Sequence, residues 1–115
     1  MSDLSNLSLV DLVKGIKKKD FTSEEITKLF INNSEKSDKL NTYITKCFDS
    51  ALISAKNFDK KKDHSGLLAG IPLAVKDLFC TKDVKTTAGS RILNNFVPTY
   101  ESTVTKKLWS EGAFL

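Results

Sequence analysis

The sequence predicts an α/β fold in which amphipathic helices come first and the first strands of a mixed sheet follow, so that helices dominate. Two observations lead to this prediction. Apolar residues recur with the helical period through the first sixty residues, whereas the run Gly70–Val75 is largely apolar and too short for a helix. Such short apolar runs are typical of strands that are covered on both faces of an α/β sheet.

The first and third helices are predicted from apolar residues that fall on one helical face. Ser8 is a suitable N-cap for the first helix, whose apolar face consists of Leu9, Leu12, Val13 and Ile16. Asn41–Thr45 is expected to be briefly extended. The third helix follows and ends at the lysines 60–62, which suit a helix C-terminus; its apolar face consists of Phe48, Ala51, Leu52, Ala55 and Phe58.

The second helix has the clearest start signal in the chain. Thr22 and Glu25 have the spacing of a capping box, in which each side chain accepts a hydrogen bond from the other residue's backbone amide. Phe21 and Ile26, which flank this pair, fit a hydrophobic staple. The apolar face ends near Asn32, so the polar stretch to Lys39 is expected to fray into a loop.

The C-terminal half is predicted to contain a strand, a helix and the beginning of another strand. The strand is Gly70–Val75, with Pro72 at its start or on a sheet edge. Ser102 is a suitable cap for the last helix and Gly112 a suitable end. A strand that begins at Ala113 has no room to pair along a useful length before Leu115, so the fold is expected to be interrupted there.

Composition argues against several classes of protein. The formal charge is +4, but the 18 basic residues are lysines apart from Arg91 and are spread along the chain, which favours a solvated surface over a nucleic-acid site. Cys47 and Cys80 lack the spacing of a metal site and are expected to be free thiols. The start Met1–Leu4 resembles neither a signal nor a transit peptide, and we expect a cytoplasmic, bacterial protein, an organellar location being the alternative.

Lys76 is the residue that we single out for chemistry. It directly follows the predicted strand, at the carboxyl end where ligand sites lie in open α/β sheets. Strand alternation places Pro72 and Ala74 on the face of Lys76, and these small side chains leave space around its amine. A lysine held partly neutral by desolvation can serve as the general base of a serine nucleophile. An ordinary solvated lysine paired with Asp77 is the alternative.

The surroundings of Lys76 resemble the start of the amidase signature family. The residues that carry the resemblance stand in the family's order and spacing: Gly-Ile-Pro-Leu-Ala-Val-Lys-Asp at 70–77, Thr-Thr-Ala-Gly-Ser at 86–90, Tyr-Glu-Ser-Thr-Val at 100–104 and Glu-Gly-Ala at 111–113. Within that family, the N-terminal helices and the stretches 41–45 and 89–98 are most similar to A subunits of glutamyl-tRNA(Gln) amidotransferases. The resemblance covers the whole chain but only an N-terminal fraction of a family member.

The resemblance implies an amide-hydrolysing enzyme with a lysine, a cis-serine and a nucleophilic serine, in which Lys76 matches the lysine. Both serines are expected beyond Leu115, so this chain alone is expected to be inactive. In the amidotransferases, glutamine supplies ammonia for the conversion of Glu-tRNA(Gln) to Gln-tRNA(Gln). The implied partners are the B and C subunits, and tRNA is held only through the complex. No cofactor or metal is expected on this chain, because ATP and magnesium are used by a partner subunit.

The domain prediction is one partial amidase domain over residues 1–115. Its N-terminal helices occupy residues 1–62, and the truncated beginning of the catalytic core occupies residues 67–115. Two alternatives remain for the function: a fragment of a stand-alone amidase, or a non-catalytic helical interaction module that docks a partner. Substrate-binding residues are not assigned.

Three other groups of side chains receive structural rather than chemical predictions. Thr86, Thr87 and Ser90 are expected in a turn that leads into a helix capped near Ser90. His64, the single histidine, is expected in a solvated loop. Cys80 is expected to serve packing.

Overall fold

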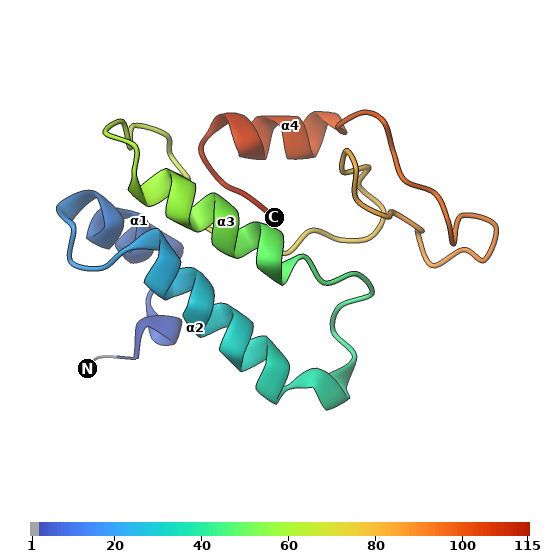
Figure 1. Ribbon diagram of the computed structural model, residues 1–115, viewed down its shortest axis with the longest axis horizontal. Coiled ribbons are helices and arrows are strands. Elements are labelled where there is room, and N and C mark those ends of the chain that lie inside the picture. The colour runs from blue at the N-terminus through green and yellow to red at the C-terminus, as the bar shows by residue number, and fades with distance from the viewer. Residues whose placement is uncertain (1–2) are drawn as a thin grey trace.

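The computed structural model describes residues 3–115, so Met1 and Ser2, on which part of the signal-peptide argument rests, lie outside the described residues. Four α-helices and two short 3-10 helices make up the regular structure (Figure 1). Their bounds are η1 Leu4–Asn6, α1 Leu9–Lys18, α2 Ser23–Lys36, η2 Asp38–Leu40, α3 Phe48–Asp59 and α4 Thr103–Ser110.

The helix starts predicted at Ser8, Thr22 and Ser102 are confirmed. Ser8 accepts a hydrogen bond from the Asp11 amide at 3.2 Å. The capping box is complete, because the Thr22 amide donates to a Glu25 carboxylate oxygen at 2.7 Å and the Glu25 amide donates to the Thr22 hydroxyl at 3.1 Å. Ser102 caps α4 by accepting from the Thr105 amide at 3.2 Å.

The segment after Asn32 differs from the prediction. α2 does not fray there but continues to Lys36, and η2 follows within two residues. The side chain of Ser34 donates to the Phe30 carbonyl inside the helix at 2.8 Å, so this polar residue is accommodated without ending the helix. Residues 41–45 form no strand and lead through a bend to α3.

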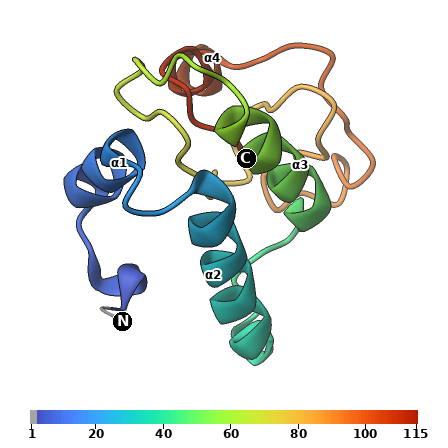
Figure 2. The same cartoon turned by 60° about the vertical axis from the view of Figure 1, so that its left-hand side comes forward.

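Helices α2 and α3 lie side by side, and α4 lies beyond α3 on the side away from α2 (Figures 1 and 2). The apolar faces of the first three helices meet the chain that follows α3 in one buried cluster, composed of Leu12, Ile16, Ile26, Phe58, Ala69 and Ile71. Ile26 is completely buried. Burial of such a side chain contributes about 1.5–3 kcal/mol, so this cluster is the main stabilising feature of the helical layer.

A carboxylate joins the end of α3 to the start of α2. Asp59 accepts hydrogen bonds from the backbone amides of Ser23 and Glu24, each at 2.9 Å. The first amides of a helix lack partners within it and carry the positive end of its dipole, which makes them suited to a carboxylate. The buried hydroxyl of Ser23 donates to the Gly70 carbonyl at 2.6 Å, so the same corner also holds the segment that leads to Lys76.

The predicted strands are not formed as strands. Within residues 3–115 the only β-pairing is a single parallel bridge between Pro72 and Phe114. Pro72 has no amide hydrogen, and Gly70 has a left-handed φ of +79°, so a regular ladder cannot run through both residues. Regular β-structure in residues 3–115 is therefore limited to this bridge.

Four backbone hydrogen bonds nevertheless hold the two segments together. The pairing runs from Leu68 to Leu73 on one side and from Glu111 to Phe114 on the other, with N···O distances of 2.8–3.2 Å. Gly112, predicted to end the last helix, lies two residues after it, beyond the C-cap Glu111, and has a φ of +93°. The start of the final strand thus lies beside the segment that precedes Lys76, as far as Phe114.

Residues 76–100 contain no helix or strand and extend to one end of the molecule (Figure 1). Their two limbs are joined by backbone hydrogen bonds from Asp83 to the Pro98 carbonyl, at 2.9 Å, and from Thr86 to the Phe96 carbonyl, at 3.0 Å. The loop is therefore held by its own backbone. Among the helices of residues 3–115, none is long and apolar enough to span a membrane.

We expect the change Asp59→Ala to loosen the start of α2, because two helix amides lose a charged acceptor. The loss of a helix cap costs about 1–2 kcal/mol, so amide hydrogen exchange at Ser23 and Glu24 should become roughly 5- to 30-fold faster. Glu35→Ala, at the other end of the same helix, is the control and should leave both rates unchanged. Equal rates in Asp59→Ala and the unaltered chain would contradict the role assigned to this carboxylate.

Candidate functional site

Lys76 lies three residues after the last hydrogen-bonded residue of the parallel pairing, Leu73. Exposure alternates along this segment as the sequence predicts: Ile71 is buried and Val75 half-buried, whereas Ala74 and Lys76 are exposed. The ammonium therefore lies on the open side of the segment. Lys76 is exposed in this structure, so the desolvation that the sequence argument requires is not provided by its burial here.

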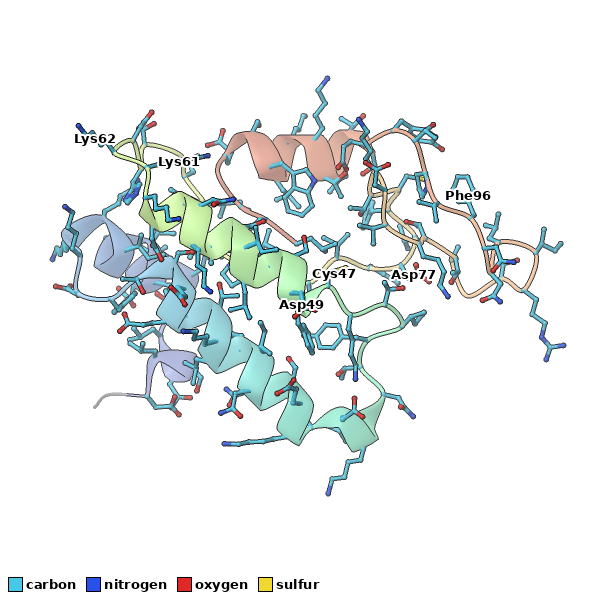
Figure 3. All side chains as sticks on the ribbon, in the orientation of Figure 1. Cys47, Asp49, Lys61, Lys62, Asp77 and Phe96 are labelled. Carbon is cyan, nitrogen blue, oxygen red and sulfur yellow. The ribbon has the colours of Figure 1, made fainter. Side chains whose placement is uncertain are left out.

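A hollow of about 570 Å³ adjoins Lys76. Its walls come from the chain before α3, from the loop after Lys76 and from the last residue, Leu115. The wall residues that matter most for the chemistry of the site are Tyr43, Cys47, Asp77, Lys85 and Thr86. Figure 3 shows Cys47 at the start of α3 and Asp77 in the loop beside it. Segments far apart in the sequence thus meet at the predicted position of the base.

Asp77 does not pair with Lys76 but with Thr87. The Thr87 amide donates to one carboxylate oxygen at 2.8 Å, and the Thr87 hydroxyl donates to the other. Partial burial acts to raise the pKa of the Asp77 carboxyl, but the hydrogen bonds from Thr87, together with the charge of Lys85, outweigh it and lower the pKa below the ordinary 3.8. The ion pair considered as an alternative from the sequence is absent among the described residues.

The hydroxyl-rich segment after Asp77 is a turn, as predicted. Thr86 and Thr87 are buried, and the Thr86 hydroxyl donates to the Val84 carbonyl at 3.1 Å. The Ser90 amide donates to the Thr87 carbonyl at 2.8 Å. The predicted helix capped near Ser90 is wrong: residues 91–95 form turns, closed by hydrogen bonds from the Asn94 amide to the Arg91 carbonyl at 3.3 Å and from the Phe96 amide to the Leu93 carbonyl at 2.9 Å.

Comparison with known proteins agrees with this geometry. The model of the family described as Amidase matches residues 25–115. The chain belongs to the amidase family. Its fold is shared with an amidase family protein from Bacillus anthracis, which is 28% identical, superposes with a TM-score of 0.86 and is matched over 97% of this chain and 23% of its own.

A second solved structure shows the same fold at 24% identity. It is described as a vestigial protein complex that reveals the evolutionary origins of an s-triazine catabolic enzyme. The TM-score is 0.87, over 95% of this chain and 25% of the other. Helix-dominated as it is, this chain therefore has the fold of the corresponding part of an amidase.

Among curated proteins, this amidase-family chain is similar to A subunits of glutamyl-tRNA(Gln) amidotransferases. The subunit from Pelagibacter ubique is 63% identical over the whole chain, and that from Rickettsia bellii is 47% identical. In both comparisons the chain spans about a quarter, 24%, of the relative's length and corresponds to its N-terminal part. The resemblance inferred from the motifs around Lys76 is thus confirmed.

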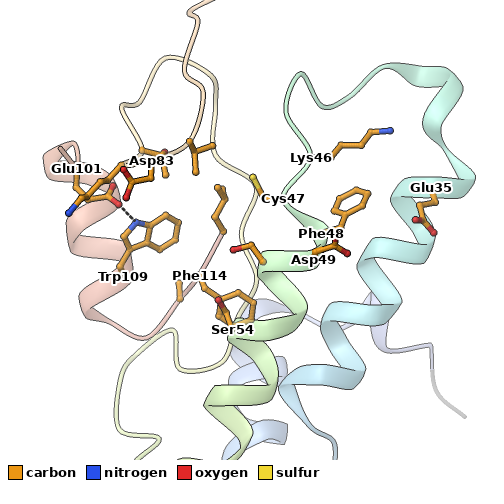
Figure 4. A pocket seen from close by; sticks show the side chains of 16 residues that line it. Glu35, Lys46, Cys47, Phe48, Asp49, Ser54, Asp83, Glu101, Trp109 and Phe114 are labelled. Carbon is orange, nitrogen blue, oxygen red and sulfur yellow. Dashed lines mark hydrogen bonds between the residues drawn. The ribbon is translucent and has the colours of Figure 1, made fainter. Parts of the chain in front are cut away.

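A larger hollow of about 850 Å³ lies between α3 and α4 (Figure 4). Trp109 forms part of its α4 wall and donates from its indole nitrogen to Glu101 at 3.1 Å. Cys47 lines this hollow as well as the one beside Lys76, and burial raises the pKa of its thiol. No local pattern in the sequence indicates that Cys47 lies at this junction, because the two hollows form only when α3 packs near the C-terminal segment.

His64 lies in a loop, as predicted, but it is half-buried rather than solvated. Its ring stacks on Phe58 with centroids 4.2 Å apart, and it lies within hydrogen-bonding distance, 3.3 Å, of the Phe58 carbonyl. Cys80 is half-buried and donates to the Tyr100 hydroxyl at 3.5 Å, a contact that raises the pKa of Tyr100. The described residues contain no group of three or more His, Cys, Asp or Glu side chains placed to hold a metal ion.

The link between Asp77 and Thr87 predicts a pH-dependent loop. Because the pKa of Asp77 is lowered in the folded chain, its contribution to stability is complete above about pH 3.8 and is lost as the pH falls through the lowered value. We therefore expect the NMR shift of the Thr87 amide to follow a titration below pH 3.8. The Asp77→Asn variant should lack this titration, whereas Asp83→Asn, in the same loop, should keep it. The link would be contradicted if the NMR shift of the Thr87 amide did not change with pH, or if it still titrated in Asp77→Asn.

Proposed function

We propose that this chain provides the N-terminal part of the glutamine-hydrolysing A subunit of a glutamyl-tRNA(Gln) amidotransferase, in which Lys76 is the general base. The 63% identity to the Pelagibacter ubique subunit supports the assignment to this branch of the amidase family. The observation that carries the role of Lys76 is its place in the fold. It stands on the open side of the chain directly after the parallel pairing, beside a hollow.

In the proposed reaction, Lys76 accepts the proton of a nucleophilic serine through a cis-serine. The serine attacks the side-chain amide carbon of glutamine, the proton held by Lys76 passes to the leaving nitrogen as the carbon–nitrogen bond breaks, and ammonia leaves for the partner subunits. Water then cleaves the acyl-serine ester and releases glutamate. Both serines belong to the segment that follows this part of a family member, so Lys76 acts only when that segment lies over the hollow. Lys76 is exposed in this structure, which agrees with this order of assembly, because a general base must be accessible to the group that donates the proton.

The proposed partners are the B and C subunits, and tRNA is reached through them. ATP and magnesium serve a partner subunit in this proposal. The even spread of charge supports an indirect role toward tRNA, since the loop that carries Lys76 contains Lys82, Lys85 and Arg91 but also Asp77 and Asp83.

The decisive experiment reconstitutes the missing part. The chain is mixed with the segment of the Pelagibacter ubique subunit that lies beyond the matched region, and glutamate release from glutamine is measured. General-base catalysis contributes about 10²–10⁴-fold, so Lys76→Ala should lower the rate at least about 100-fold. Lys82→Ala, an exposed lysine in the same loop, is the matched control and should retain the rate.

The outcomes separate the proposal from its alternatives. Association with glutamine hydrolysis that does not depend on Lys76 would remove the assigned role of the lysine. Association without hydrolysis would favour the non-catalytic interaction module. Hydrolysis of simple amides with no preference for glutamine would favour a stand-alone amidase.

A further inference from the structure

Asp77 is joined to Thr87 and its neighbour by several hydrogen bonds. Both carboxylate oxygens of Asp77 accept hydrogen bonds from Thr87, and the Asp77 carbonyl accepts a third from the Ala88 amide at 2.6 Å. Thr87 is 5% exposed, so its hydroxyl is directed inward to the carboxylate rather than to water. The two hydrogen bonds from Thr87 and the one from Ala88 thus close the loop that begins at Asp77. We name Asp77, Thr87 and these three hydrogen bonds the clasp.

Backbone strain accompanies the clasp. Ala88 has a left-handed φ of 50°, followed by Gly89 at 70°. For a residue with a Cβ atom this conformation costs roughly 1–2 kcal/mol, and it persists where surrounding contacts determine it. The bond from the Ala88 amide to the Asp77 carbonyl is such a contact. The chain therefore adopts a strained turn in order to bring Thr87 to Asp77.

The charges around Lys76 indicate a function for the clasp. Of the side chains that line the hollow in the described part of the chain, that of Asp77 is the one with a carboxylate, and those of Lys76 and Lys85 are the cations. A carboxylate paired with a lysine favours the charged ammonium and opposes its action as a base. The nearest acid to Lys76 in the sequence is thus held by hydroxyl and amide donors and by the charge of Lys85.

We propose that Asp77 and Thr87 are positioning residues for Lys76. The clasp keeps the Asp77 carboxylate occupied so that it does not pair with the Lys76 amine, and it fixes the loop that forms one wall of the hollow. This inference rests on the proposed function of Lys76 as a base. In this proposal Asp77 closes the loop by accepting the hydrogen bonds, and Thr87 keeps the Asp77 carboxylate from pairing with the Lys76 amine.

The test compares variants of the 115-residue chain by competitive acetylation at a fixed pH, followed by mass spectrometry. The measured quantity is the extent of modification of Lys76 relative to Lys82. Thr87→Val frees the carboxylate, so we expect the ratio to fall about threefold, the effect of an exposed ion pair of ordinary strength. Thr87→Ser keeps the hydroxyl and should keep the ratio.

Asp77→Asn separates charge from structure. It breaks the clasp as Thr87→Val does but removes the negative charge, so the ratio should equal or exceed that of the unaltered chain, and the double variant should behave like Asp77→Asn. If the clasp served structure alone, both single variants would shift the ratio in the same direction. That result, or an unchanged ratio in Thr87→Val, would overturn the inference.

Folding is followed by far-UV circular dichroism in every variant. If Thr87→Val loses helical structure, Thr87→Ala replaces it in the comparison with Thr87→Ser and Asp77→Asn. The reconstituted glutamine hydrolysis distinguishes the two proposals. A fall of the ratio in Thr87→Val, combined with full activity in Lys76→Ala, would remove the catalytic role of Lys76 and leave the charge-restraining role of Thr87.

Discussion

The parallel hydrogen bonds between residues 68–73 and 111–114 are the interaction on which the C-terminal half depends. They join segments some forty residues apart, so they close the long loop and place α4 beside α3. The approach is close: a Cβ atom at Gly112 would lie 2.9 Å from the Cα of Ala69. Glycine at this position lets the two backbones meet, and the pairing in turn directs the chain toward Lys76.

The helical layer supports this pairing from one side. Phe58 lies against Gly70, where an added Cβ atom would come within 2.6 Å of its ring, and Ser23 bonds to the Gly70 carbonyl. Asp59 fixes the start of α2 at the same corner. A buried apolar contact, a helix cap and a side-chain hydrogen bond thus converge on the residue before the apolar segment, which explains how a segment with so little β-structure has a defined position.

The site follows from these constraints by geometry and charge. Alternation along the paired segment directs Lys76 to the open side, and the clasp to Thr87 restrains the neighbouring carboxylate of Asp77. The similarity to amidotransferase A subunits covers the same residues, although the chain spans only 24% of such a subunit. The described part of the chain therefore presents an accessible lysine and an organised wall, to which the remainder of an amidase would add the nucleophile.

The sequence by itself determined the starts of α1, α2 and α4 and the position of Lys76, because caps such as Thr22 with Glu25 and apolar periods act within a few residues. It also determined the family, through motifs that are contiguous in the chain. Only the tertiary structure decided that the strand at 70–75 shrinks to a bridge and that Asp77 binds Thr87 instead of Lys76. These outcomes depend on contacts between distant residues and on left-handed turns, whose geometry no local pattern specifies.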